Sequence, residues 1–448
     1  MKIAMFTDAY FPRINGVAVS VRSYASELTR LGHEVVVVCL EYSEEQQRIS
    51  SFDEKSNDEM SPFKIIRIPS AKTVFSKEDR MVRIDKWLLI KKTMDRFRPD
   101  VIHINSEWTV GYLGALYAKH RHVPFVFTFH TMWEDYLTNY VNFLPDFTLR
   151  KIGRSVVKFY LKRAHVIIAP TERIASVVKE YKINKDVDIL PTGIPDEQTK
   201  YSFPHSFQIS GKFYKKFPHM KGKKILLFVG RIVKEKNLSF LFDVLERVKD
   251  KIPKTALLFV GGGPYLEDLQ NEAAERGLKD SVAFTGYVGS GDLVYFYRMA
   301  TVFVFPSKTE TQGLVTVEAM LSGLPVVAIG EMGTVDVMQG DNGGFMVKDN
   351  LDEFSSKVLC LMKNQNLRKQ KSKEALAWGS KWKISNLTPN LVKCYEKAIK
   401  IVEGFYDSES EKFYEEFDSE FRSELGIDEN ELGHDDEKVE SGKWKTES

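Results

Sequence analysis

Short apolar segments of strand length, separated by helical segments, follow one another in two series along this chain of 448 residues. A strand that is apolar at every position is buried on both faces, which is typical of a parallel sheet covered by helices on both sides. The alternation therefore predicts an α/β fold with two doubly wound parallel-sheet domains that face a cleft. The first series reads KIAMF, EVVVVCL, KIIRI, DVIHI, FVFTF, VIIAP and DILP, and the second reads ILLFVG, ALLFVGGG, VAFTG, VFVFP, PVVAI and GFMV.

The boundaries of the two domains follow from where the alternation stops. We expect a first domain over residues 1–196 and a second over residues 223–378. Residues 197–222 contain Pro, Ser and Gly without clear periodicity, so they are predicted to be a connector. A helical segment over residues 379–402 follows, and residues 403–448 form an acidic tail that we expect to be flexible.

The composition is that of an ordinary globular protein, with 43% hydrophobic and 28% charged residues. The N-terminus begins directly as a strand, without the charged and apolar regions of a signal peptide, and no apolar run approaches the length of a membrane-spanning helix. The three cysteines, Cys39, Cys360 and Cys394, form no metal or redox spacing. We therefore expect a cytoplasmic protein that does not span the membrane.

The net charge of +2 conceals an uneven distribution of charged residues. The tail holds 17 acidic and 5 basic residues, which leaves a net charge of +14 on residues 1–402. A basic body indicates an anionic partner, which can be a nucleic acid, a charged small molecule or a membrane surface.

Two common classes of nucleotide-binding protein are excluded by their missing motifs. The first strand is not followed by G-x-G-x-x-G, the glycines at 261–263 lack the last glycine of that motif, and G-x-x-x-x-G-K-[ST] is absent. An NAD dehydrogenase or a P-loop NTPase is therefore not expected. Asp186 and Asp188 fit a D-x-D metal pattern, but they stand at the start of a strand, which favours a structural role. No metal site is predicted.

Two carboxylates, Glu310 and Glu318, flank a glycine where a strand leads through a loop into a helix. In open α/β sheets, ligands bind where such a loop leaves the carboxyl end of a strand. The backbone N–H groups of Gln312, Gly313 and Leu314 would face an anion there, assisted by the helix dipole. Taken alone, two Glu residues at this spacing more often cap a helix and face solvent.

The loop after the first strand of the second domain carries Arg231 and Lys236 ahead of another helix. Two cations beside a helix N-terminus fit a diphosphate, although alone they are more often solvated. In the first domain, Gly16 precedes small residues and a helix expected from about Ser20, so a ligand can approach the backbone closely. If these loops meet Glu310, the cations suit phosphates and the carboxylate suits hydroxyls, as in a sugar joined to a diphosphate.

Further polar side chains follow two strands of the first domain. His130 stands just past the strand FVFTF, where an imidazole could orient or polarise a reacting hydroxyl, or serve a structural role. Glu107 and Trp108 follow the strand DVIHI, while His103 lies within that strand and is expected in the core.

The segment FTLRKIGRSVVKFYLKRAH predicts a helix in which aliphatic and basic residues alternate. Ile152, Val156, Phe159 and Tyr160 lie roughly on one face, and the segment KWLLIKKTMDRFR has the same character. Such a helix suits an anionic membrane surface, and an ordinary packed helix with a solvated basic face is the alternative. The residues assigned to a membrane- or acceptor-facing surface are Arg150, Lys151, Arg154, Lys158, Lys162, Trp108 and Trp133.

These motifs, taken in order, resemble the family 4 retaining glycosyltransferases of GT-B fold over about residues 1–400. The segments that carry the resemblance are FTDAYFPRINGVAVS, HINSEW, FTFHTMWEDYL, APTERI, LPTGI, GRIVKEKN, FVGGGP, FTG and SKTETQGLVTVEAMLSGLPVVA. The wording of FHTMWEDY and TETQGLV is most similar to the bacterial diacylglycerol glucosyltransferases and galactosyltransferases. The resemblance implies two Rossmann-like domains and a C-terminal helix that crosses back to the first domain, here near residues 384–400.

The resemblance also implies roles for individual residues in binding a nucleotide sugar. Gly16 would approach the diphosphate, Arg231 and Lys236 would clamp it, and the amides of Gln312, Gly313 and Leu314 would face phosphate and sugar. Glu310 would contact the hexose and Glu318 the ribose. His130 would lie near the reacting sugar, and Val288 near the uracil. Two features depart from the family: the connector and the acidic tail have no counterpart that we can assign, and Pro195 stands where an acidic residue is common.

The expected activity is therefore metal-independent transfer of glucose from UDP-glucose to a membrane diacylglycerol, with retention at the anomeric carbon and no cofactor. Transfer of a second sugar to a glycolipid, or UDP-galactose or GDP-mannose as donor, is the alternative within the class. A basic nucleic-acid- or membrane-binding protein is the alternative outside it, but no nucleic-acid module is present in the sequence. The expected partners are the nucleotide sugar, the lipid acceptor and the inner face of the cell membrane.

Overall fold

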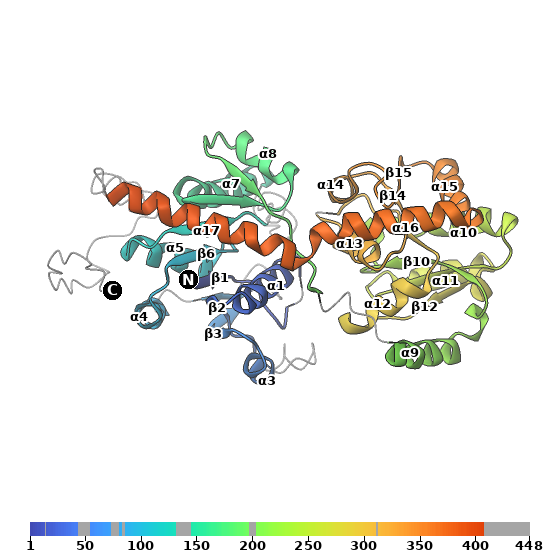
Figure 1. Ribbon diagram of the computed structural model, residues 1–448, viewed down its shortest axis with the longest axis horizontal. Coiled ribbons are helices and arrows are strands. Elements are labelled where there is room, and N and C mark those ends of the chain that lie inside the picture. Colours follow the sequence, from blue (N-terminus) through green and yellow to red (C-terminus); the bar gives the residue numbers. More distant parts are fainter. Residues whose placement is uncertain are drawn as a thin grey trace. The chain divides into compact units, whose positions relative to one another are not determined.

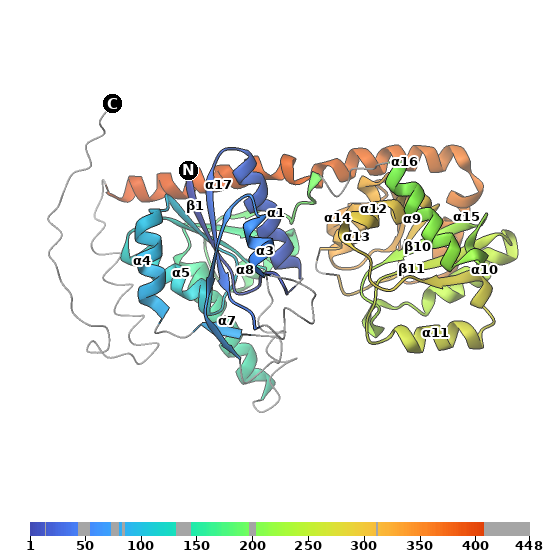
Figure 2. The ribbon, with the colours of Figure 1, turned by 90° about the horizontal axis from the view of Figure 1, so that it is seen from below.

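Two parallel β-sheets form the framework of the computed structural model, which describes residues 1–13, 15–43, 54–72, 80–82, 86–130, 145–196, 203–310 and 312–406. The first sheet has the strand order β3-β2-β1-β6-β7-β8-β9 and the second β12-β11-β10-β13-β14-β15. Helices cover both faces of each sheet (Figures 1 and 2). The prediction of two Rossmann-like doubly wound domains is confirmed.

The strands of the first sheet are β1 Lys2–Phe6, β2 Glu34–Leu40, β3 Lys64–Ile68, β6 Val101–Ile104, β7 Phe125–Thr128, β8 Val166–Ala169 and β9 Val187–Ile189. Its helices are α1 Gly16–Arg30, α3 Glu54–Glu59, α4 Trp87–Phe97, α5 Thr109–His120, α7 Asp146–Arg163 and α8 Glu172–Glu180. In a separate small sheet, β4 Ser70–Lys72 pairs antiparallel with β5 Arg80–Val82.

The strands of the second sheet are β10 Lys224–Val229, β11 Thr255–Val260, β12 Val282–Phe284, β13 Val302–Phe305, β14 Val326–Ile329 and β15 Gly344–Val347. The α-helices are α9 Phe203–Lys216, α10 Phe240–Lys251, α11 Leu266–Glu275, α12 Ser290–Met299, α13 Leu314–Leu321, α14 Gly333–Met338, α15 Leu351–Lys363, α16 Gln365–Gly379 and α17 Ile384–Tyr406, and the short 3-10 helix η4 spans Lys234–Lys236.

Each sheet has a topological switch point beside its first strand. β1 pairs with β2 on one side and β6 on the other, and β10 pairs with β11 and β13 in the same way. The chain runs in opposite directions away from these strands, so the loops that leave their carboxyl ends diverge and leave a crevice. The loops that carry Gly16, Arg231 and Glu310 all begin at these two points.

Each domain has its own apolar core, as continuous apolar strands require. Phe127 stacks on Tyr160 in the first domain, with ring centroids 5.1 Å apart. In the second domain Phe228 on β10 stacks on Phe305 of the neighbouring strand β13, with ring centroids 5.9 Å apart. All four rings are buried, so the two sheets are fixed independently.

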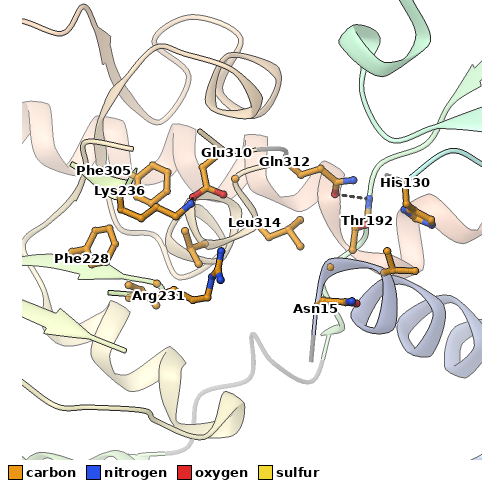
Figure 3. Close-up of a pocket in the computed structure, with 16 residues that line it drawn as sticks. Asn15, His130, Thr192, Phe228, Arg231, Lys236, Phe305, Glu310, Gln312 and Leu314 are labelled. Atoms are coloured by element: carbon orange, nitrogen blue, oxygen red, sulfur yellow. Dashed lines mark hydrogen bonds and ion pairs between the residues drawn. The ribbon is translucent and has the colours of Figure 1, made fainter. Parts of the chain in front are cut away.

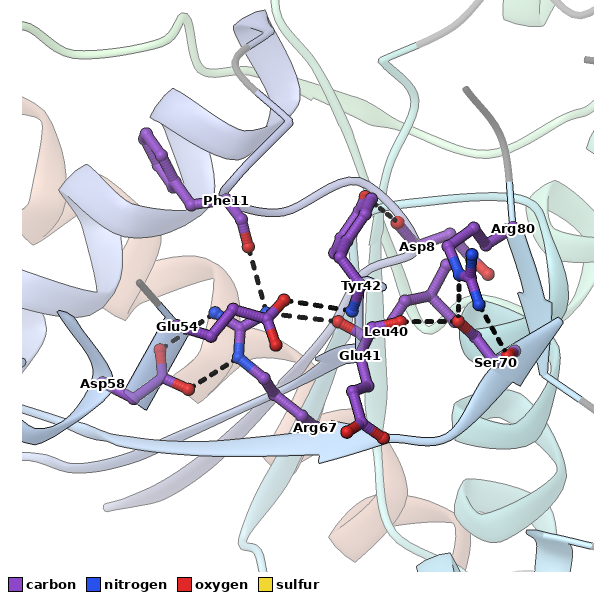
Figure 4. Close-up of polar contacts among 10 residues, drawn as sticks. All are labelled: Asp8, Phe11, Leu40, Glu41, Tyr42, Glu54, Asp58, Arg67, Ser70 and Arg80. Atoms are coloured by element: carbon purple, nitrogen blue, oxygen red, sulfur yellow. Dashed lines mark hydrogen bonds and ion pairs between the residues drawn. The ribbon is translucent and has the colours of Figure 1, made fainter. Parts of the chain in front are cut away.

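A buried ion-pair cluster holds the loop between β1 and α1 (Figure 4). Arg67 on β3 is 10% exposed and forms two hydrogen bonds with Asp58, of 2.6 and 2.9 Å, and one of 2.9 Å with Glu54. The same guanidinium donates to the backbone carbonyls of Phe11 at 3.0 Å and Leu40 at 3.2 Å. The rigid five-donor fork of an Arg side chain makes this arrangement possible. It ties α3 and the loop after β1 to the edge of the sheet.

The C-terminal helix α17 docks on the first domain, although it follows the second in the sequence. Leu391, Tyr395 and Ala398 are fully buried. The Tyr395 hydroxyl lies 2.8 Å from Nδ1 of His103 on β6, and Lys397 forms a 3.2 Å ion pair with Asp188 on β9. The expected crossover helix is confirmed. It begins at residue 384 and extends to 406, whereas we expected a segment from 379 to 402.

Two local expectations differ from the structure. Helix α1 begins at Gly16 instead of near Ser20, because the Asn15 side chain caps it by accepting a 2.8 Å hydrogen bond from the Ala18 N–H. Much of the expected connector is helical, since residues 203–216 form α9. Ile209 and Phe213, four residues apart, are buried in the core of the second domain and stabilise this helix.

None of the helices within the described ranges is both long enough and apolar enough to cross a membrane.

Candidate active site

A cavity of about 390 Å³ is lined by residues from the switch points of both sheets (Figure 3). The first domain contributes the start of α1, His130 and, shortly after β9, Thr192. The second domain contributes the ends of β10 and β13 and the start of α13. The lining residues are Asn15, Gly16, Val17, His130, Thr192, Phe228, Val229, Gly230, Arg231, Lys236, Phe305, Glu310, Gln312, Gly313, Leu314 and Val315.

The N-terminus of α1 presents an open glycine to this cavity. Gly16 is exposed, and no described atom lies within 4 Å of a Cβ built on it. A helix leaves its first four N–H groups without intrahelical partners, and the Asn15 side chain accepts from one of them, that of Ala18. The remaining donors and the positive end of the helix dipole favour an anion here.

The loop after β10 supplies the two predicted cations in different surroundings. The Arg231 side chain is 72% exposed and lies 4.0 Å from the Glu235 carboxylate. Lys236 is only 11% exposed and forms an ion pair with Glu310, which is 19% exposed. Because Lys236 already faces a carboxylate, a phosphate placed here would compete with or share that contact. Because the Arg231 side chain is mostly exposed to solvent, it can change conformation to contact a ligand.

The loop after β13 positions Glu310 and opens α13. The Glu310 carbonyl accepts a 2.8 Å hydrogen bond from the N–H of Gly333 at the start of α14, so the backbone of this loop is fixed. Gly313 adopts the left-handed conformation, with φ of 65°, which a residue with a side chain rarely adopts. The first-turn N–H groups of α13 then begin at Leu314, at the cavity wall. The side chain of Gln312 reaches to Thr192, which also lines the cavity, and its Oε1 accepts a 3.3 Å hydrogen bond from the Thr192 N–H (Figure 3).

Glu318 and Val288 do not line the cavity as the described residues define it. Glu318 lies one turn into α13, instead of the two turns expected from the sequence, and is partly buried. It accepts a 2.8 Å hydrogen bond from the buried Tyr297 hydroxyl. Burial raises the pKa of Glu318 to about 7, with the Tyr297 hydrogen bond opposing that rise.

His130 lies at the first-domain side of the cavity and hydrogen-bonds to a buried amide. Its Nε2 is 3.3 Å from Oδ1 of Asn105, which follows β6. Desolvation lowers the pKa of His130 to about 4, so the ring is neutral near pH 7. His103 is a core residue as expected: it is 2% exposed, and its ring nitrogens lie 2.8 Å from the Tyr395 hydroxyl and 2.7 Å from that of Thr128.

Helix α7 packs on the first domain through a face that only partly overlaps the apolar face noted in the sequence. Its buried side chains are Leu149, Val157, Tyr160 and Leu161, whereas Ile152 is 44% exposed. Of the expected apolar face, Tyr160 is buried, and Val156 and Phe159 are partly buried. The packed face lies about 50–100° around the helix from the apolar face noted in the sequence, because contact with the sheet determines which side chains are buried.

The basic residues assigned to the surface group lie on the outer side of this helix. Arg150, Lys151, Arg154 and Lys162 are exposed and Lys158 is partly exposed. Trp108 caps α5 and packs partly buried against the first core, so it contributes little exposed surface. Trp133 lies outside the described residues.

Within the described ranges, no group of three or more His, Cys, Asp or Glu side chains is placed to hold a metal ion. Asp188, which belongs to the D-x-D pattern, forms the ion pair with Lys397 described above.

Several cavity residues were not singled out in the sequence. Asn15 had a recognisable signal, since Asn directly before a run of small residues is typical of a helix N-cap. Phe228 and Phe305 appeared only as parts of buried strands, and Thr192 had no distinguishing pattern. Asn105 and Tyr297, which contact His130 and Glu318, had no signal, because such contacts depend on the tertiary fold.

Comparison with known proteins matches each of the two domains to a glycosyltransferase family model. The family model described as Glycosyltransferase Family 4 matches residues 14–198, and the one described as Glycosyl transferases group 1 matches residues 211–378. The fold also matches the crystal structure of Anabaena HepE in complex with UDP, with a TM-score of 0.67 at 16% identity, over 88% of this chain and 99% of that one. At that identity the likeness concerns the fold alone, and it confirms the GT-B architecture.

Two relatives are similar over most of their length, and both are named alpha-monoglucosyldiacylglycerol synthase. The protein from Streptococcus pneumoniae is 32% identical over 335 residues, which is 74% of this chain and 71% of the relative. The protein from Acholeplasma laidlawii is 30% identical over 385 residues, 84% of this chain and 92% of the relative. The chain therefore belongs to the family 4 glycosyltransferases of GT-B fold, and it is a hexosyltransferase similar to the glycolipid synthases of that family.

Proposed function

We propose that this protein transfers glucose from UDP-glucose to the free hydroxyl of 1,2-diacylglycerol at a membrane surface, with retention of configuration, to give an α-glucosyl diacylglycerol. The observation that carries the proposal is the cavity in which the α1 N-terminus, the Lys236–Glu310 pair and the α13 N-terminus meet. The names of the two relatives, which specify monoglucosyldiacylglycerol synthesis, support glucose as the transferred sugar and diacylglycerol as the acceptor.

The proposed donor pose assigns each part of UDP-glucose to groups of matching chemistry. The diphosphate lies among Lys236, Arg231 and the first-turn N–H groups of α13. The glucose hydroxyls donate to Glu310, and Gly16 lets the diphosphate approach the start of α1. The ribose and uracil extend toward Glu318 and Val288, beyond the residues that line the cavity.

The proposed reaction is a front-face displacement at the anomeric carbon. The acceptor oxygen attacks C1 from the side of the leaving group while the bond from C1 to the phosphate oxygen breaks, through a state with oxocarbenium character. The bonding electrons stay on the leaving phosphate, and the acceptor proton passes to that same phosphate oxygen, so the products are the glucosyl lipid and UDP. Arg231, Lys236 and the α13 N-terminus stabilise the charge that develops on the phosphate. Since these groups supply positive charge, no metal ion or other cofactor is assigned to the reaction.

The acceptor is a lipid, so the cavity has to work beside a membrane. On α7, Phe147 is 75% exposed and Ile152 is 44% exposed, and exposed basic residues surround them. On α4, Leu88 is 72% exposed and Leu89 is 45% exposed next to the basic residues of that helix. At an anionic surface each cation contributes up to about 1 kcal/mol, and the apolar side chains add insertion energy. We therefore assign the protein to the inner face of the cell membrane as a peripheral protein.

The activity is tested with purified protein, micelles of diacylglycerol and anionic lipid, and UDP-glucose, UDP-galactose or GDP-mannose in separate reactions. We expect a glucolipid from UDP-glucose. A product from another donor would correct the donor, and no lipid product from any donor would refute the proposal.

Substitutions in the cavity test the donor site. We expect Lys236→Ala and Glu310→Gln each to lower turnover on the order of 100-fold, because each removes a charge that contacts the donor. Lys234→Ala is the matched control, since Lys234 is exposed on the same loop and does not line the cavity. If all three variants behaved alike, the donor site would be misplaced.

Vesicle flotation tests the membrane surface. We expect the double variant Phe147→Ser/Lys151→Glu to bind anionic vesicles more weakly than the native protein while keeping turnover on a short-chain, water-soluble diacylglycerol. Lys373→Glu, at an exposed position of α16, makes the same charge change elsewhere and serves as the control. Equal vesicle binding by the double variant and the native protein would remove α7 from the membrane surface.

A further inference from the structure

A buried asparagine fixes the orientation of the cavity histidine. Asn105 directly follows β6 and is 2% exposed. Its backbone N–H donates a 2.8 Å hydrogen bond to the carbonyl of Phe6 at the end of β1, so its position is set by the switch point of the first sheet. Its side chain lies between His103 and His130, with Nδ2 3.3 Å from the His103 carbonyl and Oδ1 3.3 Å from Nε2 of His130.

The two contacts of this amide determine which of its ends faces which histidine. A backbone carbonyl oxygen can only accept a hydrogen bond, so the amide group that faces the His103 carbonyl has to be the NH₂. The Asn105 oxygen is then directed at His130. An amide oxygen also only accepts, so Nε2 of His130 has to carry the proton in this contact.

We propose that Asn105 is a positioning residue that holds His130 as the Nε2–H tautomer and thereby leaves Nδ1 as a hydrogen-bond acceptor for a substrate hydroxyl in the cavity. The proposal rests on the proposed function, in which sugar and acceptor hydroxyls enter this cavity. It adds to that function a definite polarity for His130: the ring accepts a hydrogen bond from the substrate and donates one to the protein.

The surroundings of His130 keep the ring in the neutral form that this arrangement needs. Burial lowers the pKa of His130 to about 4 and that of His103 to about 3, so neither ring is charged near pH 7. The charged groups that line the same cavity are Arg231, Lys236 and Glu310, and the last two are paired with each other. A neutral imidazole has one donor and one acceptor nitrogen, so fixing the donor also fixes the acceptor.

The tautomer is tested without substrate, which separates this proposal from the proposed function. Protein labelled with ¹⁵N-histidine is examined by long-range ¹H–¹⁵N NMR between pH 6 and 8, and the His130 signals are assigned with a His130→Gln sample. We expect a protonated Nε2 and an unprotonated Nδ1. A protonated Nδ1, or a charged ring at pH 7, would overturn the proposal even if glucosyl transfer were confirmed. Conversely, failure to glucosylate diacylglycerol would leave this result unaffected.

Two variants test whether Asn105 sets the state of the ring. In Asn105→Asp a carboxylate faces Nε2 and favours the imidazolium, which has no acceptor nitrogen. A carboxylate at this distance raises the pKa of a histidine by about 1–3. We expect NMR titration to show that rise, and we expect the turnover of this variant to follow the neutral fraction of His130 measured in the same sample. With a pKa near 7, turnover at pH 6 would be about tenfold below its value at high pH.

Asn105→Leu removes both side-chain contacts at similar volume and introduces no charge. We expect it to lower turnover at every pH without adding a new titration, while UDP binding and the thermal unfolding midpoint report whether the fold is intact. Asn342→Asp, at a distant position on the second domain, controls for the added charge. If Asn105→Asp left the pKa of His130 unchanged, or if its turnover did not follow the neutral fraction, Asn105 would not be a positioning residue.

Discussion

The raised pKa of Glu318 predicts that the stability of this protein falls as the pH rises from about 4.5 to 7. Burial raises the pKa of its carboxyl group from the ordinary 4.5 to about 7 in the folded protein. Below pH 4.5 the group is protonated in both the folded and the unfolded state and has no effect. Between pH 4.5 and 7 the unfolded chain ionises while the folded protein stays protonated, so stability is lost as the pH rises. Each pH unit across this interval costs the folded state up to about 1.4 kcal/mol.

The perturbation that tests this is Glu318→Gln, which keeps the shape and can still accept from Tyr297 but cannot ionise. From the two pKa values, the native protein is penalised by about 1 kcal/mol at pH 5 and about 3 kcal/mol at pH 8. Glu318→Gln has no such penalty, because a Gln side chain does not ionise. Its advantage over the native protein should therefore grow by about 2 kcal/mol between these pH values. For a domain of this size the growth corresponds to roughly 4–8 °C in the thermal unfolding midpoint.

Calorimetry of both proteins at pH 5 and pH 8 provides the measurement. Packing differences between Glu and Gln do not vary with pH. The difference in unfolding midpoint between the two proteins therefore changes with pH only through the ionisation of Glu318. Glu172→Gln makes the same substitution at an exposed position of α8 and serves as the control. The reasoning is refuted if Glu318→Gln changes the unfolding midpoint equally at both pH values, or if the stability of the native protein relative to the variant is higher at pH 8 than at pH 5. Since Glu318 is also proposed to bind the ribose, we expect the more stable variant to bind UDP more weakly.

Three further outcomes are expected. Gly16→Ala should change the free energy of unfolding by less than about 1 kcal/mol, because a Cβ there meets no described atom, yet raise the KM for UDP-glucose measured in the transfer assay. Arg67→Met should lower the free energy of unfolding in urea by about 3–5 kcal/mol, because it leaves the buried Glu54 and the partly exposed Asp58 without their guanidinium partner; a loss below about 1 kcal/mol would show that the cluster is not coupled to folding. Chelation with EDTA should leave glucosyl transfer unchanged, and restoration of lost activity by Mg²⁺ would contradict the metal-independent mechanism.

The strands and the switch points are predictable because a strand buried on both faces leaves a continuous apolar run. For the same reason the residue pattern alone places Arg231 and Glu310 at one edge of a sheet. Helix α9 was missed because Pro204 and Gly211 interrupt its pattern, although Pro204 stands in the first turn, where a helix tolerates proline.

The sequence indicated an apolar face on α7 but not which side of the helix packs on the sheet, because apolar residues occur around most of its circumference. Ile152 and Val157 are equally apolar, and the sequence does not show which of them meets the sheet. The buried polar contacts were beyond prediction for a different reason. Asn105 and Tyr297 acquire their roles from neighbours 21–25 residues away in sequence, and the hydrogen bonds that they form follow from tertiary packing alone.

The hydrogen bond between Tyr395 and His103 has a consequence for how the protein is made. His103 is buried in the first domain, but its partner lies 292 residues further along the chain. During synthesis the strands of the first domain leave the ribosome long before α17 does, so the site where Leu391, Tyr395 and Ala398 are buried stays uncovered while the whole second domain is translated. The first domain can therefore reach its final packing only after nearly all of the protein has been synthesised. A chain that stops before α17 would leave His103 and the apolar surface around it uncovered. Exposed apolar surface of this kind promotes aggregation.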